Sequence, residues 1–303
     1  MPLQIGLDEG SDSGVEVEDD DLLYNDGGSS FVNSSGLSST PSIASSIRNY
    51  QYEPNDEQEQ SRLELHHHIH RLKLGGHLYR SPIRQNVSTI LDLGTGTGVW
   101  AIEMAEVPPN LHFEVDDFEA DWSHDTQFDF IHARDLQGSV SNYDRLVIQA
   151  YDQLNPGGWF EFAEVDLIVC GDDDTIQQAK SLKECTRLVK EASARMGRLM
   201  GTATEHIQRL SNAGFVNIRE DVYKMPMSPW PKDPKLKELG RYYQVNMLES
   251  LDAYSLALLT RVLHWPVEEV RVLLNGARSE LLDRRIHTYA NWFHVYGQKP
   301  RNP

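Results

Sequence analysis

The stretch that decides the fold runs from Val87 to Glu106 and reads VSTILDLGTGTGVWAIEMAE. Val87–Leu93 is a short β-branched and apolar run, which is typical of a buried parallel strand. An alternating glycine loop follows over Gly94–Gly98, and Val99–Glu106 has a helical pattern. Glycines let the backbone approach a ligand closely, and the start of a helix offers free N–H groups. Strand, glycine loop and helix therefore predict the first unit of a nucleotide-binding α/β fold.

The glycine spacing leaves a dinucleotide open as one ligand class. The fingerprint G-x-G-x-x-G/A fails from Gly94, because Val99 occupies the third position, but it fits from Gly96 with Gly98 and Ala101. A P-loop is excluded, because no Gly-Lys-Ser/Thr follows. A dinucleotide-binding protein is thus one alternative.

The string D-x-G-x-G-x-G resembles the first motif of class I S-adenosylmethionine-dependent methyltransferases. In that family the loop wraps the methionine part of the cofactor, S-adenosyl-L-methionine, and the acid at the strand end supports it. The resemblance implies a Rossmann-like α/β sheet and an enzyme that transfers a methyl group. It also implies cofactor binding by Asp92, Gly94, Thr95, Gly96 and Gly98.

Later segments extend the same resemblance. Phe128–Arg134 is similar to the family's fourth strand, which ends beside the transferring methyl group, so Arg134 joins the expected cofactor site. Leu154–Glu161 resembles the Leu-x-Pro-Gly-Gly turn and the fifth strand. Leu210–Ile218 resembles the helix-to-strand step before the final hairpin, and Trp292–Gly297 resembles the closing antiparallel strand.

The segment before the glycine loop narrows the family. The sequence PNDEQEQ at residues 54–60 leads into a leucine-containing helix, predicted from Asn55 or Asp56 to Gly75. Together these features resemble the fungal LaeA-like methyltransferases, which are associated with velvet regulators and secondary metabolism. The resemblance covers about residues 42–300. It implies a small metabolite or a regulatory protein as methyl acceptor, and velvet-type regulatory proteins as partners.

Two segments of that family are absent from this chain. One would stand between Glu53 and Pro54. The other, about twenty residues long by comparison with the family, would follow Glu106 and holds a second strand that ends in a ribose-binding acid. The expected sheet therefore lacks its usual second strand. A catalytically weak or inactive regulator, acting by protein binding, is the alternative that this absence favours.

Leu111–Val115 has two interpretations in such a shortened chain. In the favoured one it is the third strand, with Asp117 facing the adenine amino group and Asp116 beside it. In the other it moves next to the first strand, and Asp116, which lies 20 residues after Gly96, binds the ribose. Both place Asp116 and Asp117 in the cofactor site.

The chemistry requires few protein groups, because methyl transfer from a sulfonium needs alignment, exclusion of water and sometimes removal of a proton. No diagnostic nucleophile or triad is present, and no catalytic residue is assigned. His132, Arg134, Glu161 and Glu164 lie near strand ends as candidate bases or orienting groups, and His132 and Glu164 are the catalytic candidates retained.

Other reactive side chains have simpler interpretations. His66 and His70 have the i,i+4 spacing of metal ligands, but no third ligand is visible, so we predict a polar helix face and no metal site. Asp172–Asp174 is interpreted as a helix-initiating loop. Cys170 and Cys185 are interpreted as structural thiols.

Composition divides the chain into three parts. Residues 1–60 hold thirteen acids and one base, so −12 of the formal net charge of −18 lies there. Residues 1–55 are expected to be a disordered acidic, serine-rich tail. Residues 56–224 and 288–303 would form the methyltransferase α/β domain. Residues 225–287 would form a helical lid over the acceptor pocket, with helices over Pro234–Leu248, Ser250–Leu263 and Val267–Leu282.

Composition also excludes some classes of protein. With 28 Lys and Arg residues against 46 Asp and Glu residues, the chain has no global basic field for direct binding of nucleic acid. No 18-residue apolar run is present, so no membrane span is expected. Two cysteines, and an N-terminus without the pattern of a secretory signal, predict an intracellular protein, cytoplasmic or nuclear.

Overall fold

A computed structural model of the protein describes residues 56–84, 87–105 and 111–301. The predicted acidic tail lies outside the described residues, and so does the segment 106–110 that follows the first helix of the α/β unit. No described helix is long and apolar enough to cross a bilayer.

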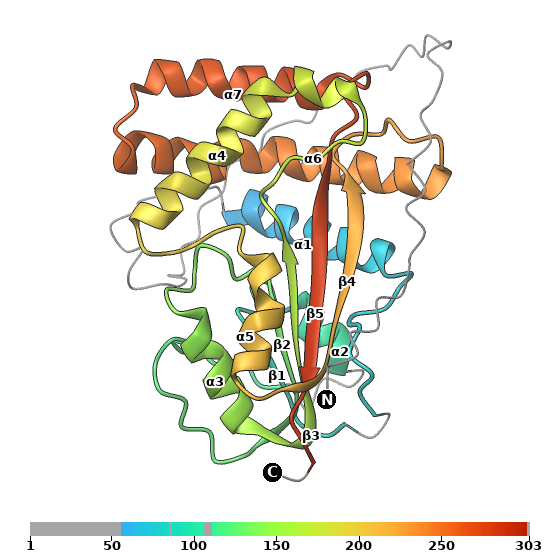
Figure 1. The fold of residues 1–303 in the computed structure, drawn as a ribbon, viewed down its shortest axis with the longest axis vertical. Helices are drawn as coiled ribbons and strands as arrows, with labels where there is room; N and C mark the ends of the chain where they lie inside the picture. The colour runs from blue at the N-terminus through green and yellow to red at the C-terminus, as the bar shows by residue number, and fades with distance from the viewer. Residues whose placement is uncertain (1–55, 85–86, 106–110, 302–303) are drawn as a thin grey trace, which may run out of the picture.

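The centre of the protein is a mixed five-stranded sheet with the order β1-β2-β3-β5-β4 (Figure 1). The first three strands are parallel, and β5 pairs antiparallel with both β3 and β4. The bounds are β1 (Ile90–Leu93), β2 (Phe128–Arg134), β3 (Leu154–Val165), β4 (Val216–Pro226) and β5 (Tyr289–Gln298). The strands predicted before the glycine loop, over Phe128–Arg134, around Pro-Gly-Gly and near the end of the chain are confirmed, and so is the α/β fold class.

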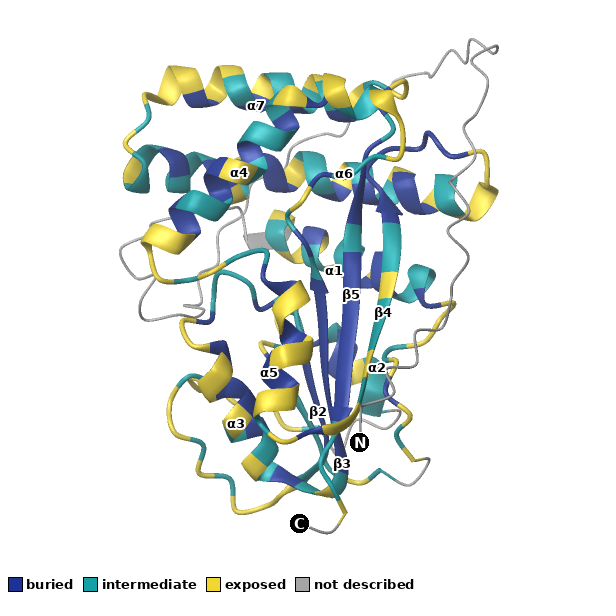
Figure 2. Ribbon diagram, viewed as in Figure 1, coloured by how far each residue is buried: buried dark blue, intermediate teal, exposed yellow. Residues whose placement is uncertain are grey.

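Helices cover both faces of the sheet. The helices α3 (Tyr143–Gln153) and α5 (His206–Asn212) lie on one side, and α2 (Val99–Ala105) lies on the other (Figure 1). Strand β3 is therefore buried from Gly158 to Glu164, which is dark blue in Figure 2. Its side chains Phe160 and Phe162 are completely buried. This double burial explains why the parallel strands read as continuous apolar runs rather than as alternating ones.

Four helices form a layer across the carboxyl ends of β1, β2 and β3 (Figure 1). This helical layer consists of α1 (Asp56–Lys73), α4 (Lys180–Arg195), α6 (Pro234–Ala257) and α7 (Val267–Leu282). Its side chains share one apolar core with the end of the sheet. The predicted helix after residue 55 is confirmed, and α4 joins the layer from a part of the sequence that precedes residues 225–287.

The expected break between helices at residues 248–250 is wrong. Helix α6 continues unbroken through this point to Ala257, and a π-helical turn over Leu258–Val262 follows. No Gly or Pro interrupts the helix here, and the Ser250 hydroxyl donates to the carbonyl of Asn246 one turn earlier. The serine is therefore compatible with the helix interior.

The predicted strand over Leu111–Val115 is wrong in both of its interpretations. These residues adopt no strand, and β1 pairs with β2 alone within the described part of the chain. Only Leu111 packs against the core, whereas Phe113 is 56% exposed and Val115 is 91% exposed. A parallel strand needs cover on both faces, which this segment lacks. The expected absence of the usual second strand holds for the described residues.

The chain enters and leaves the α6–α7 hairpin at one place. The backbone N–H of Met227 and the indole Nε1–H of Trp230 both donate to the carbonyl oxygen of Thr288, at 2.9 and 3.0 Å. All three residues are buried. The two connections between the hairpin and the sheet are thereby tied together.

Candidate active site

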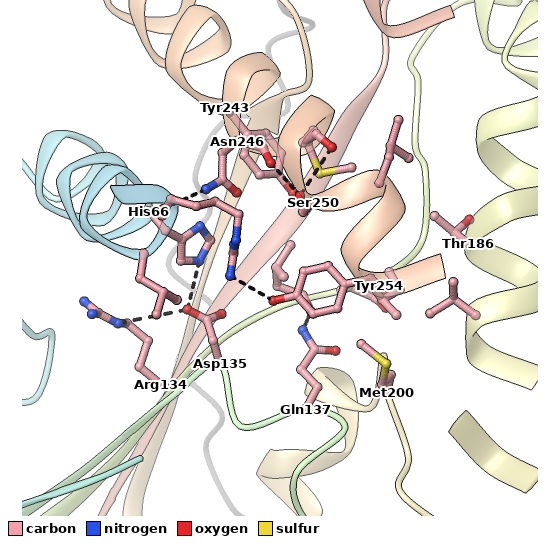
Figure 3. Close-up of a pocket in the computed structure, with 18 of the residues that line it drawn as sticks. His66, Arg134, Asp135, Gln137, Thr186, Met200, Tyr243, Asn246, Ser250 and Tyr254 are labelled. Atoms are coloured by element: carbon pink, nitrogen blue, oxygen red, sulfur yellow. Dashed lines mark hydrogen bonds and ion pairs between the residues drawn. The ribbon is translucent and has the colours of Figure 1, made fainter. Parts of the chain in front are cut away.

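A cavity lies between the sheet and the helical layer, where β1, β2 and β3 end (Figure 3). Its sheet side is formed by the glycine loop after β1 and by residues at the ends of β2 and β3, namely Arg134, Asp135, Gln137 and Val165–Leu167. Helices α1, α4 and α6 form the opposite side. Ligands of open α/β sheets bind at the carboxyl ends of the strands, so this position is the expected one.

The glycine loop presents its backbone to the cavity. Gly94, Gly96 and Gly98 all have positive φ, at 67°, 56° and 79°. A Cβ added to Gly96 would meet no atom closer than 3.9 Å, so the loop is open on the side that faces the cavity. The Thr95 hydroxyl is buried without a hydrogen-bond partner among the described residues. The loop therefore offers unoccupied polar groups and space to a ligand.

His132 holds the carboxylate at the end of β1. Its Nδ1 lies 2.8 Å from Oδ1 of Asp92, and its ring stacks on Trp100 with centroids 3.9 Å apart and an angle of 4°. His132 is only 1% exposed and does not line the cavity, whereas Asp92 does. The histidine therefore positions Asp92 from behind, in a place where it touches no ligand in the cavity.

The sequence-derived site residues divide into two groups. Those that line the cavity are Asp92, Gly94, Thr95, Gly96 and Arg134. Asp116 and Asp117 are exposed and do not line it, and their carboxylates accept from nearby backbone N–H groups of their own loop. Gly98 lies beneath the ring of Phe113.

Glu164 is also remote from the cavity. It is 1% exposed and lies on the face of β3 that meets α3 and α5. Its nearest polar neighbours are the Tyr143 hydroxyl at 3.4 Å and Nε2 of His206 at 3.7 Å. As a catalytic candidate it has no route to a ligand in this structure.

The sequence analysis missed Asp135, which directly follows β2. Its Oδ2 lies 2.9 Å from Nε2 of His66 and 3.2 Å from Nε2 of His70, and its φ is 53°. Burial alone would raise the pKa of Asp135, but the two histidines lower it well below its ordinary value. Two sequence features could have indicated this contact. One is an acid immediately after a predicted strand, and the other is the i,i+4 spacing of His66 and His70.

A second buried polar chain lies behind the cavity. Nζ of Lys73 is 3.0 Å from Nε2 of His294, whose Nδ1 is 3.0 Å from Oε1 of Glu161. Burial lowers the pKa of Lys73 to about 7 and that of His294 to about 4. Burial acts to raise the pKa of Glu161, but hydrogen bonds and charge, those of His294 foremost, lower it. Glu161 therefore stays ionised and serves as a structural acceptor.

The residues that line the cavity fit the methionine end of S-adenosylmethionine. The carboxylate of Asp92 suits an ammonium group, and the glycine loop brings backbone N–H groups and an open surface to the same place. Asp116 and Asp117, the acids expected in the cofactor site, do not line the cavity; besides Asp92, the acids that line it are Asp135 and Asp166.

Residues 65–220 match the family described as a methyltransferase domain, and the chain belongs to this family. It is a methyltransferase of the LaeA-like type, as the following relatives show. Methyltransferase pytC of Aspergillus terreus is 34% identical and aligns with 87% of this chain and 92% of its own. Secondary metabolism regulator LAE1 of Cochliobolus heterostrophus is 35% identical, over 82% of this chain and 88% of its own.

Another relative carries a more specific name. Protein-methionine methyltransferase laeA of Emericella nidulans is 32% identical and aligns with 82% of this chain and 72% of its own. Among solved structures, a phosphoethanolamine N-methyltransferase of Haemonchus contortus matches with a TM-score of 0.47 at 15% identity, over 86% of this chain and 62% of its own. The family requires a methyl acceptor, and none of these names identifies the acceptor of this chain.

Proposed function

We propose that this protein transfers the methyl group of S-adenosylmethionine to a small, largely apolar acceptor held between the glycine loop and helices α4 and α6. The observation that carries the proposal is the continuity of the cavity. The same space is lined by the loop on one side and by apolar side chains of the helical layer on the other, among them Leu182, Val189, Met247 and Leu251. Pockets of this kind bind small molecules through apolar walls and a few polar groups.

The residues of the chain have separate roles in this reaction. The cofactor supplies an electrophilic methyl group when bound. Asp92, positioned by His132, and the backbone of the loop hold its methionine end, and Arg134 lies beside them. Across the cavity, the apolar side chains of α4 and α6 exclude water and align the acceptor.

Polar groups on the helical side would orient the acceptor. Tyr254, Ser250 and Thr186 reach the cavity from α6 and α4 (Figure 3). The Tyr254 hydroxyl also accepts from Nη2 of Arg62 at 3.3 Å, so its orientation is fixed. These hydroxyls are suited to hydrogen-bond a polar group on an otherwise apolar molecule.

Cofactor binding is tested by calorimetry on the full chain. We expect S-adenosylmethionine to bind, and Gly96→Val to abolish binding, because a branched side chain fills the open face of the loop at positive φ. Gly197→Val is the matched control, since Gly197 has a φ of 69° and open space around it but lies away from the cavity. Failure to bind at millimolar cofactor, or equal affinity in Gly96→Val, would overturn the assignment. Binding of NAD(H) instead would support the dinucleotide alternative.

The class of acceptor is tested with cofactor labelled in its methyl group. After incubation with a cell extract, we expect the label in the fraction extracted by organic solvent. Label found only in precipitated protein would contradict a small acceptor and support a protein acceptor, as the name of the Emericella nidulans relative describes for that protein.

The second candidate function is a regulator that acts by protein binding with little or no catalysis. The exposed positions of Asp116 and Asp117, away from the cavity, favour it, since a charge-assisted contact to the ribose contributes about 1.5–3 kcal/mol to binding. Velvet-type regulatory proteins would then be the partners, and the cytoplasm or nucleus the location. Absence of cofactor binding together with capture of such a partner by the full chain would support this function over the first.

A further inference from the structure

The geometry points to a metal site: we propose that His66, His70 and Asp135 bind one divalent cation of the zinc class at the edge of the cavity. His66 and His70 lie one turn apart on α1, and Asp135 follows β2, so helix and sheet both contribute. Their ligand atoms all lie within 4.8 Å of one another.

The observed distances are close to those of a bound metal. In a tetrahedral zinc site with bonds near 2 Å, ligand atoms are about 3.3 Å apart. Here Oδ2 of Asp135 is 2.9 Å from Nε2 of His66 and 3.2 Å from Nε2 of His70 (Figure 3 shows the first contact). A small convergence of the two imidazoles would complete the arrangement.

Unused hydrogen-bonding capacity also indicates a ligand. Both imidazoles converge on the same oxygen of Asp135, while its other oxygen, Oδ1, is buried with no hydrogen-bond partner among the described residues. A cation between the three side chains would use both nitrogens and could engage the second oxygen as well. The left-handed backbone of Asp135, at a φ of 53°, aims this carboxylate at α1.

The environment fixes the side chains in place. The rings of His66 and His70 both lie against Trp292, with centroids 5.1 and 4.3 Å apart. His70 is buried and His66 is half-buried, so both rings are held within the protein. Because packing already fixes these two side chains, a bound ion would need to order them little further.

The donor set selects the class of metal. Two imidazole nitrogens and a single carboxylate favour Zn²⁺ or a similar transition metal, whereas Mg²⁺ and Ca²⁺ prefer several oxygen ligands. The three donors therefore suit a transition metal that prefers imidazole nitrogen as a ligand.

The proposed metal site lies at the edge of the cavity that would hold the methyl acceptor. His66 and Asp135 both line the cavity, whereas His70 lies behind them, so a remaining coordination position would face the cavity. This part of the inference rests on the proposed function, in which methyl transfer takes place beside this coordination position. A hydroxyl or thiol group of an acceptor that ligates the ion would be oriented there.

Metal binding is measured apart from catalysis. The full chain is freed of metal with a chelator and titrated with Co²⁺, followed by visible absorption, and with Zn²⁺, followed by calorimetry. We expect one equivalent of metal and, for Co²⁺, the intense bands of four- or five-coordinate nitrogen and oxygen ligation. His66→Gln and His70→Gln should each weaken binding by about a hundredfold or more.

The matched control is His68→Gln, an exposed histidine on the same helix, which should bind metal as the unmodified chain does. Asp135→Asn provides a third variant if a histidine variant fails to fold, as judged by circular dichroism. Absence of a stoichiometric complex, or equal affinity in all of these variants, would overturn the proposal. The result does not depend on S-adenosylmethionine, so it remains separate from the test of the proposed function.

Discussion

Replacing Glu161 with glutamine should destabilise the fold strongly, although it changes one atom. Oε2 of Glu161 accepts from the backbone N–H of Arg80 at 2.9 Å and from the N–H and hydroxyl of Ser81 at 2.7 Å each. Oε1 accepts from the N–H of Arg80 at 3.0 Å and lies 3.0 Å from Nδ1 of His294. All these neighbours can donate hydrogen bonds to the carboxylate. The NH2 group of glutamine is itself a donor, so it would face another donor in place of an acceptor.

The least costly orientation of the glutamine places its NH2 group toward His294. The imidazole must then accept with Nδ1 and carry its proton on Nε2, which faces the amine of Lys73 at 3.0 Å. Three hydrogen bonds lose the charge of their acceptor, at about 1 kcal/mol each, and one buried donor is opposed, at about 1–3 kcal/mol. The expected loss in the free energy of unfolding is therefore about 4–6 kcal/mol, a large share of the stability of a typical domain.

Urea unfolding followed by circular dichroism measures this loss, and Glu164→Gln is the control. Glu164 is equally buried and only three residues further along β3, but its polar contacts are long, at 3.4 and 3.7 Å. We expect Glu164→Gln to cost less than about 1.5 kcal/mol. A loss below about 1 kcal/mol in Glu161→Gln, or equal losses in the two variants, would refute the reasoning.

Two further predictions concern pH and packing. Because the pKa of Lys73 falls from 10.5 to about 7 on folding, the folded chain releases a proton that the unfolded chain keeps, so stability should rise with pH between about 7 and 10.5. Lys73→Met should flatten that rise in urea unfolding curves measured across the interval, and an unchanged rise would assign it to other groups. Gly240→Ala should lower the unfolding free energy by about 2–4 kcal/mol despite the better helix propensity of alanine, because the added Cβ overlaps the backbone carbonyl of Ser228. Gly276→Ala, which meets only the side chain of Ser181, should cost less, and the opposite order in thermal unfolding would contradict this account.

The sheet could be predicted from sequence because its signals are local. Continuous apolar runs before and after the glycine loop identify parallel strands, and Pro-Gly-Gly marks the step from α3 into β3. Leu111–Val115 misled the prediction because its composition is strand-like while its neighbours in space provide no cover. Similarly, Ser250 resembles a helix N-cap in sequence, but its hydroxyl donates to the carbonyl of Asn246 within α6.

The site was only partly predictable, because several of its contacts join distant segments. The glycine loop and Asp92 follow from a motif within one stretch of sequence. His66 and Asp135 are 69 residues apart in sequence, and their contact exists only because α1 crosses the end of β2. The partner of Asp92, His132, likewise depends on the pairing of β1 with β2.

The two ends of the α6–α7 hairpin are joined at Thr288, while along its length the hairpin packs against α1, α4 and the end of the sheet. Helix α6 has 24 residues and is about 36 Å long, so its last turn lies far from this attachment. That end carries Tyr254, whose hydroxyl meets Arg62 of α1. The tyrosine–arginine contact therefore ties to α1 the end of α6 that lies furthest from Thr288, beside the cavity that both side chains line.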